Sequence, residues 1–187
     1  MGYGTPVKEK KLPLVGVQED CTIVGDQLFL LEDKNGNLSA SITFGQTNGS
    51  TVQQRVFDSD TEDGQADTNA WIHHVCTKIV PTEEYEAAVA PSTGFADFIN
   101  RVNQVTAGAY QGKKYRMLFH YNKKGYVTTP RYAPFIEEMG KVNSISAFLN
   151  SNSKSAAYVR NLLTRPEQPQ PDAEQPVTQG ESDDLPF

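Results

Sequence analysis

Residues 21–57 read CTIVGDQLFLLEDKNGNLSASITFGQTNGSTVQQRVF, and their pattern predicts the fold class. Residues 21–31 are rich in β-branched and large apolar side chains, and residues 38–44 alternate apolar with polar ones. Both patterns are typical of strands. Asn35-Gly36 between them is a strong hairpin signal, and a further strand is expected over residues 51–57. Short strands joined by tight turns predict an antiparallel barrel or sandwich.

An acidic run, DSDTEDGQAD over residues 58–67, follows the last of these strands. Its spacing imitates the start of a calcium-binding EF-hand loop, but Asp63 and Asn69 stand where that loop needs Gly and Glu. We therefore expect a solvated loop. Carboxylates of this number also leave a metal-dependent nuclease open, although no basic residue nearby could hold a phosphate.

A helical block is predicted next, over about residues 69–107. Thr68-Asn69 can cap its first helix, and apolar residues then recur at helical spacing. The three expected helices run from Ala70 to Pro81, over residues 82–90, and from Ser92 to Gly108. The block therefore separates two regions that are rich in strands.

The second strand region is a predicted hairpin over residues 113–132, with Lys123-Lys124 at its tip. The pattern of residues 133–140 fits a strand end or a helical turn equally well. Residues 153–163 predict a helix, and Arg165-Pro166 closes a single domain over residues 1–165.

The hairpin carries the best candidates for a binding site, because aromatic and basic residues are interleaved along it. Exposed aromatic rings stack on unpaired bases, and Lys and Arg neutralise the phosphate backbone. One face of the hairpin must line the core, and we favour Tyr121, Tyr126 and Tyr132 over Phe119 as surface rings. The candidate DNA-binding residues are Lys113, Lys114, Tyr115, Arg116, Phe119, Tyr121, Lys123, Lys124, Tyr126, Arg131 and Tyr132.

Charge is distributed very unevenly along the chain, whose net charge is −6 at pH 7. Residues 1–100 carry 6 basic and 15 acidic residues, whereas residues 101–165 carry 11 basic and 2 acidic ones. Residues 166–187 hold six acids and no Lys or Arg. The basic region is suited to phosphate or to the acidic end of the same chain.

The final 22 residues, 166–187, include five prolines and a single aromatic residue, so we expect a disordered acidic tail. It ends in Asp183-Asp184-Leu185-Pro186-Phe187, where two carboxylates lead into an apolar tip. Such a tip suits a partner with a pocket for the Phe ring and a basic rim.

This tip resembles the acidic Asp-Asp-x-Pro-Phe ends of bacterial and phage single-stranded DNA-binding proteins. The resemblance implies that Asp183, Asp184, Leu185, Pro186 and Phe187 recruit replication and repair enzymes. Ser182 departs from the family pattern, which usually has a third Asp at that place.

The predicted order of elements is also similar to an OB-fold, a mainly β, five-stranded antiparallel barrel with a helix inserted between strands three and four. The inserted block is longer here than one helix. The family resemblance implies a protein that coats and protects single-stranded DNA without sequence specificity during replication, recombination and repair. The preference for DNA over RNA rests on this resemblance alone. The alternative is a phage structural or assembly module without a nucleic-acid function.

Other classes find little support in the sequence. A signal peptide and an apolar run long enough to span a membrane are missing, so a cytoplasmic protein is expected, in the host cytoplasm if it is phage-encoded. Cys21 and Cys76 are expected to be free buried thiols. His73, His74 and Cys76 match no familiar zinc spacing, and we expect no metal, no cofactor and no enzymatic activity. The sequence does not indicate an oligomeric state.

Overall fold

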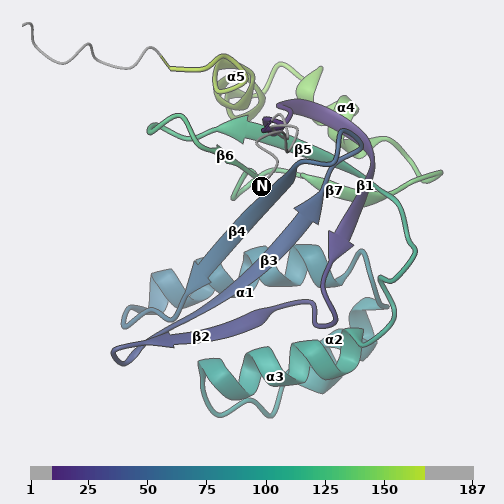
Figure 1. Cartoon of the computed structure of the whole chain (residues 1–187). Coiled ribbons are helices and arrows are strands. Elements are labelled where there is room, and N and C mark those ends of the chain that lie inside the picture. The colour runs from purple at the N-terminus through teal and green to yellow at the C-terminus, as the bar shows by residue number, and fades with distance from the viewer. Residues whose placement is uncertain (1–9, 167–187) are drawn as a thin grey trace, which may run out of the picture.

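Seven strands form one curled antiparallel sheet in the computed structural model, which describes residues 10–166 (Figure 1). The predicted tail and its tip, Asp183–Phe187, lie outside the described residues. The fold is mainly β and consists of short antiparallel strands, as the sequence predicts. The curl of the sheet makes the fold barrel-like. The strands are β1 (Gly16–Val24), β2 (Leu30–Lys34), β3 (Asn37–Gly45), β4 (Thr51–Phe57), β5 (Tyr115–Tyr121), β6 (Val127–Thr128) and β7 (Ile136–Glu138).

The first strand causes the curl, because its two halves pair with different neighbours. Its first half pairs with β5, and its second half pairs with β3. The register shifts between Gln18 and Cys21, where Asp20 has a positive φ of 56°. Such a bulge bends and twists a strand. On the far side, the Thr128 hydroxyl of β6 donates to Gln54 Oε1 of β4, which links the two open edges.

The predicted hairpin at Asn35-Gly36 is confirmed. Both residues have positive φ, as a tight two-residue turn requires, and β2 and β3 pair on either side of them. The strand-like residues 21–31 divide between the end of β1 and the start of β2, because the chain bends between these two strands. The Asn103 side chain holds this bend by bonding both the N–H and the C=O of Phe29, each at 2.9 Å.

Two groups of helices lie at opposite ends of the sheet in Figure 1. The first group matches the predicted helical block, and the second follows the last strand. The helices of the first group are α1 (Glu62–Cys76), α2 (Thr82–Val89) and α3 (Phe95–Thr106); those of the second are α4 (Ser144–Leu149) and α5 (Lys154–Asn161). Residues 133–140, which the sequence left open, contribute β7, and α4 was not predicted.

The acidic run is the other correction, because most of it belongs to α1 and is not a loop. Thr61 caps the helix by accepting a hydrogen bond from the N–H of Gly64. Glu62 and Asp63 occupy the first turn, where negative charge stabilises the helix dipole. The helix therefore begins eight residues before the predicted start at Ala70.

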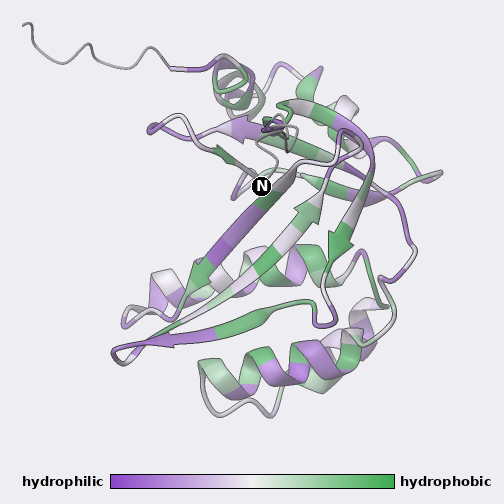
Figure 2. Cartoon of the chain, viewed as in Figure 1, coloured by the Kyte–Doolittle hydropathy of each residue, from purple (hydrophilic) through white to green (hydrophobic). Residues whose placement is uncertain are grey.

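Aromatic residues tie α1 to the sheet. The Trp71 ring stacks on Phe135 with 5.4 Å between ring centroids, and it meets the edge of Phe29. Across the sheet, Phe44 and Phe119 make a second edge contact. Hydrophobic and hydrophilic residues alternate along α3 in Figure 2, and its Ile99 and Val102 are buried in the same core. None of the helices within residues 10–166 is long and apolar enough to cross a membrane.

Candidate nucleic-acid interface

Strand β5 buries both of its faces, which removes part of the predicted site. Tyr115 and Phe119 are fully buried, and so are Met117 and Leu118 from between them. The expectation that one face of the strand is exposed is wrong, because α4 and α5 bring Ile145 and Val159 into the same core. Tyr115 and Phe119 therefore cannot stack on a base in this structure.

Arg116 is engaged in ion pairs within the protein. Its Nη1 lies 2.7 Å from Glu137 Oε1, its Nε lies 3.1 Å from Glu19 Oε1, and its side chain is only 12% exposed. Glu137 Oε2 in turn accepts the backbone N–H of Ser144 at the start of α4. The guanidinium thus holds the sheet and α4 together and is not available to phosphate.

Two other predicted residues, Lys113 and Lys114, lie at the wrong end of β5. Lys113 Nζ donates to the carbonyl of Ile79, 3.3 Å away. Seven residues of strand separate this end from the hairpin tip, a distance of about 20 Å. The structure therefore does not bring these lysines together with Lys123 and Lys124.

The hairpin tip itself presents basic and aromatic side chains to solvent. Lys123, Lys124 and Tyr126 are exposed, and Tyr126 is 68% so. The Asn122 side chain organises the turn by accepting the N–H groups of Lys124 and Tyr126. Tyr121 is half-buried, and its N–H donates to the carbonyl of Leu162.

Beyond the hairpin, residues 129–132 form a ridge between two cavities. Arg131 and Tyr132 are exposed, Tyr132 to 75%, while Thr129 and Pro130 are buried. One cavity, of about 450 Å³, lies between the ridge and α5. The other, of about 490 Å³, lies between the ridge, the end of β4 and α1. Arg131 lines both cavities.

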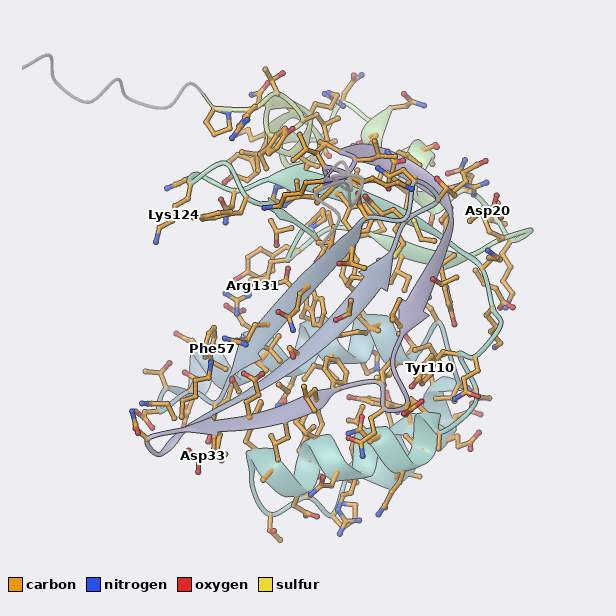
Figure 3. All side chains as sticks on the ribbon, viewed as in Figure 1. Asp20, Asp33, Phe57, Tyr110, Lys124 and Arg131 are labelled. Atoms are coloured by element: carbon orange, nitrogen blue, oxygen red, sulfur yellow. The ribbon has the colours of Figure 1, made fainter. Side chains whose placement is uncertain are left out.

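These cavities bring in residues that the sequence analysis missed. Tyr158 and Lys154 of α5 line the first cavity with Arg131. Phe57 and Arg55 of β4 line the second cavity, and Phe57 is 58% exposed. In Figure 3, Lys124, Arg131 and Phe57 follow one another along the same side of the molecule. The alternation along β4 could have identified Phe57 as an outward residue, but nothing local places α5 beside the ridge.

We call this surface the basic-aromatic face. It joins the hairpin tip, the ridge, the end of β4 and the exposed side of α5, and it has aromatic and cationic side chains throughout. Its members are Phe57, Lys123, Lys124, Tyr126, Arg131, Tyr132, Lys154 and Tyr158.

The charge difference predicted along the chain is also a difference in space. Residues 58–107, which include α1–α3, carry 9 acidic and 2 basic residues. Residues 108–166, which include the hairpin, α4 and α5, carry 10 basic and 2 acidic residues. These two groups of helices occupy opposite ends of the sheet (Figure 1). A polyanion is attracted to the end that carries the hairpin tip and α5.

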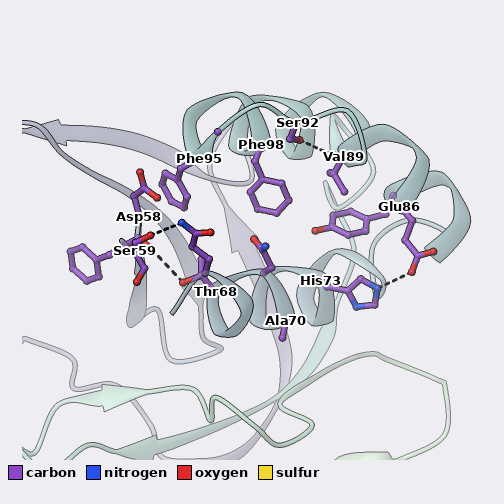
Figure 4. Close-up of a pocket in the computed structure, with 15 residues that line it drawn as sticks. Asp58, Ser59, Thr68, Ala70, His73, Glu86, Val89, Ser92, Phe95 and Phe98 are labelled. Atoms are coloured by element: carbon purple, nitrogen blue, oxygen red, sulfur yellow. Dashed lines mark hydrogen bonds and ion pairs between the residues drawn. The ribbon is translucent and has the colours of Figure 1, made fainter. Parts of the chain in front are cut away.

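A further cavity, of about 730 Å³, lies between α1 and the α2–α3 pair (Figure 4). Phe95, Phe98 and Tyr85 contribute aromatic walls, and Asp58 and Glu86 contribute carboxylates. No Lys or Arg is among its lining residues. It is therefore unsuited to the phosphate groups of a nucleic acid.

The candidate metal ligands and the two thiols are the remaining reactive groups among the described residues. Between residues 10 and 166, no group of three His, Cys, Asp or Glu side chains is arranged to hold a metal ion. Cys21 and Cys76 are free and buried, as predicted. Burial raises the pKa of the Cys21 thiol to about 11, and it raises the pKa of Cys76 further. Both thiols therefore stay protonated near neutral pH.

Comparisons of the chain with protein-family models, with curated proteins and with solved structures find no match. The function of the basic-aromatic face is therefore argued from the chemistry and geometry of its residues.

Proposed function

We propose that this protein binds single-stranded DNA without sequence specificity through its basic-aromatic face. The observation that carries the proposal is the exposure of four aromatic rings beside lysine and arginine on one side of the molecule. Those rings belong to Phe57, Tyr126, Tyr132 and Tyr158.

Exposed rings and cations together favour a single strand over a duplex. A base that is already paired and stacked offers no face to an aromatic side chain, whereas an unpaired base gains about 1–3 kcal/mol by stacking on one. Every base has such a face, so the contact tolerates any sequence. Lys123, Lys124, Arg131 and Lys154 supply charge for the backbone without reading bases.

The order of strands supports a finer assignment of the fold, to an OB-fold. In that proposal β1, β3 and β4 form the first three strands, α1–α3 form the insertion, and β5 with β6 complete the barrel. The bulged β1 that pairs in two directions, and the Gln54–Thr128 bond between β4 and β6, both fit a barrel that is nearly closed. OB-folds bind oligonucleotides on strands two and three and in the adjoining loops, which is where Phe57 and the hairpin tip lie.

The tip of the chain completes the proposal. We propose that Asp183–Phe187 binds replication and repair enzymes, and that the acidic tail returns to the basic-aromatic face when DNA is absent. Both ideas rest on the resemblance of the tip and on the charge of the chain, with six acids in residues 166–187 and a strongly basic region before them.

A titration of the full-length protein with fluorescent oligo-dT tests the proposal. Binding should weaken as salt increases, with a slope of about −0.7 in the logarithmic plot for each phosphate contacted. A duplex of the same length should compete poorly. Affinity that is independent of salt, or equal affinity for duplex, contradicts the proposal and favours the assembly module.

Two additional measurements complete this experiment. Tyr158→Ala should weaken oligo-dT binding by about 5- to 100-fold, the equivalent of one lost stacking contact, without changing the melting temperature. The oligonucleotide should stay intact when it is incubated with the protein and Mg²⁺ or Mn²⁺. Its degradation would instead favour a metal-dependent nuclease.

A further inference from the structure

A hydrogen bond joins the acidic helix α1 to the basic-aromatic face. The Tyr132 hydroxyl donates to Asp67 Oδ2 over 2.6 Å. The two residues are 65 positions apart in sequence, so the contact is made by the fold and not by a local turn. Asp67 is half-buried on α1, whereas the Tyr132 ring remains 75% exposed. The hydroxyl end of the side chain is therefore held while the ring stays open to solvent.

The bond lies next to the cavity between α1 and the ridge, because the sequence neighbours of its two residues, Thr68 and Arg131, line that cavity. Gly64, Thr68 and Trp71 line the α1 side of this cavity, and Thr128, Thr129 and Arg131 line the ridge side. Thr128 of β6 and Gln54 of β4, which also line this cavity, are joined by a second hydrogen bond. Side chains from two elements thus fix the ridge, which has no strand or helix of its own between β6 and β7.

The charge of Asp67 does not by itself suit a surface that binds DNA. Asp67 and Arg131 both act on the Tyr132 hydroxyl. Asp58 lines the adjoining cavity, so negative charge borders the basic-aromatic face here. A negative charge at this place repels a phosphate backbone. The contact of Asp67 with Tyr132 offers a reason for its presence. An exposed tyrosine samples several rotamers, and a ligand that stacks on it must immobilise it; a side chain that is already held avoids this loss.

We propose that Asp67 is a positioning residue that holds the Tyr132 ring as a preformed platform for one unpaired base. The inference rests on the proposed function, because it assigns a role within the same single-stranded DNA site. It predicts different effects on DNA affinity for two substitutions of Asp67. Loss of the hydrogen bond weakens binding, whereas loss of the charge alone leaves binding equal or tighter.

Four variants of the full-length protein separate these effects. Asp67→Ala removes the bond and the charge, Asp67→Asn keeps an oxygen that accepts the hydroxyl, and Tyr132→Phe keeps the ring but removes the donor. Asp63→Ala is the matched control, because it removes one carboxylate from the first turn of the same helix. Circular dichroism should show the same helix content in all four.

Oligo-dT and an abasic oligodeoxynucleotide of the same length are the two probes. Asp67→Ala and Tyr132→Phe should each weaken binding to oligo-dT by about 3- to 10-fold, as expected when part of one stacking contact is lost. A fifth protein, the double variant Asp67→Ala/Tyr132→Phe, should bind no more weakly than either of its single variants. Asp67→Asn and Asp63→Ala should bind at least as tightly as the wild type. Binding to the abasic strand should not weaken in any variant.

Two results would overturn the inference while leaving the proposed function intact. One is wild-type affinity for oligo-dT in Asp67→Ala. The other is an equal loss for oligo-dT and the abasic strand, which would indicate that Asp67 only supports the shape of the ridge. Failure of the wild-type protein to bind oligo-dT would instead overturn the proposed function and this inference with it.

Discussion

Among single residues, His74 shows most clearly how burial controls protonation. Burial lowers its pKa from 6.5 to about 4, and the charges of Lys78 and His73 act in the same direction. Its Nε2 has no hydrogen-bond partner among the described residues, and its ring lies against Phe135, with 5.0 Å between centroids. The folded protein therefore keeps this imidazole neutral, whereas the unfolded chain protonates it below about pH 6.5.

Acid should therefore reduce stability through His74. Because its folded pKa is depressed, its neutral form contributes fully above pH 6.5, and the contribution is lost as the pH falls toward 4. We expect the free energy of unfolding to drop by about 2 kcal/mol from this group, an amount limited by the partial exposure of the ring. Urea unfolding at a series of pH values would measure it.

The comparison that isolates His74 uses two glutamine variants. His74→Gln should flatten the fall in stability between pH 6.5 and 4, while His73→Gln should keep it, because the His73 side chain is 43% exposed and pairs with Glu86. An unchanged pH dependence in His74→Gln would contradict the assignment.

At the scale of elements, one buried carboxylate fastens α4 to the sheet. Glu137 of β7 pairs with Arg116 of β5 through one oxygen, and its other oxygen accepts the N–H groups of Ser144 and Ile145. Burial by itself raises the pKa of Glu137, but the hydrogen bonds from Ser144 and Arg116 outweigh burial and lower it. The ionised form is thus the one that holds α4 in place.

Removal of this carboxylate should be costly. Glu137→Ala leaves the Arg116 charge with only the exposed Glu19 as partner, and we expect a loss of about 3 kcal/mol in the free energy of unfolding. The neighbouring Glu138 pairs with Lys141 at the surface, so Glu138→Ala should cost less than about 1 kcal/mol. Equal losses of unfolding free energy for the two variants in a denaturant titration would show that the buried ion pair stabilises the protein no more than the surface pair does.

The elements that the sequence predicts well are those with local signals. Asn35-Gly36 specifies its turn through backbone conformation, and Ser153 caps α5 by accepting the N–H of Ala156. The bend between β1 and β2 was missed because Asn103, more than seventy residues away, satisfies the backbone there. The burial of β5 was missed for the same kind of reason, since helices later in the chain cover its second face.

In the candidate site, the difference between residues predicted from local signals and residues placed by long-range packing is larger than in the fold. Lys123, Lys124 and Tyr126 were predicted from the hairpin alone, because a tip projects into solvent whatever surrounds it. Phe57 and Tyr158 belong to the same face only through the packing of β4 and α5 around the ridge. Side chains alternate between the two faces of β5, but this alternation does not distinguish a strand exposed on one face from a strand covered on both faces.

At the scale of the whole molecule, a strongly basic region that carries the basic-aromatic face is followed directly by the acidic end of the chain. The basic end of the sheet carries the hairpin tip and α5, and α5 is followed within a few residues by the tail. We propose that the 21 residues after Pro166 act as the tail that the sequence predicts, whose average reach of about 25 Å for a chain of this length extends to the neighbouring ridge. In the proposed function, the tail and DNA therefore compete for one surface.

Deletion of residues 181–187 should separate the two activities of the proposed function. It removes three of the six acids of the tail, so oligo-dT binding should be unchanged or tighter, most visibly at low salt where charge repulsion is least screened. Recruitment of partner enzymes should be lost. Phe187→Ala is the control that keeps all the acids: it should lose recruitment while DNA affinity stays at the wild-type value. Weaker DNA binding after the deletion would mean that the tail supports the site and does not compete for it.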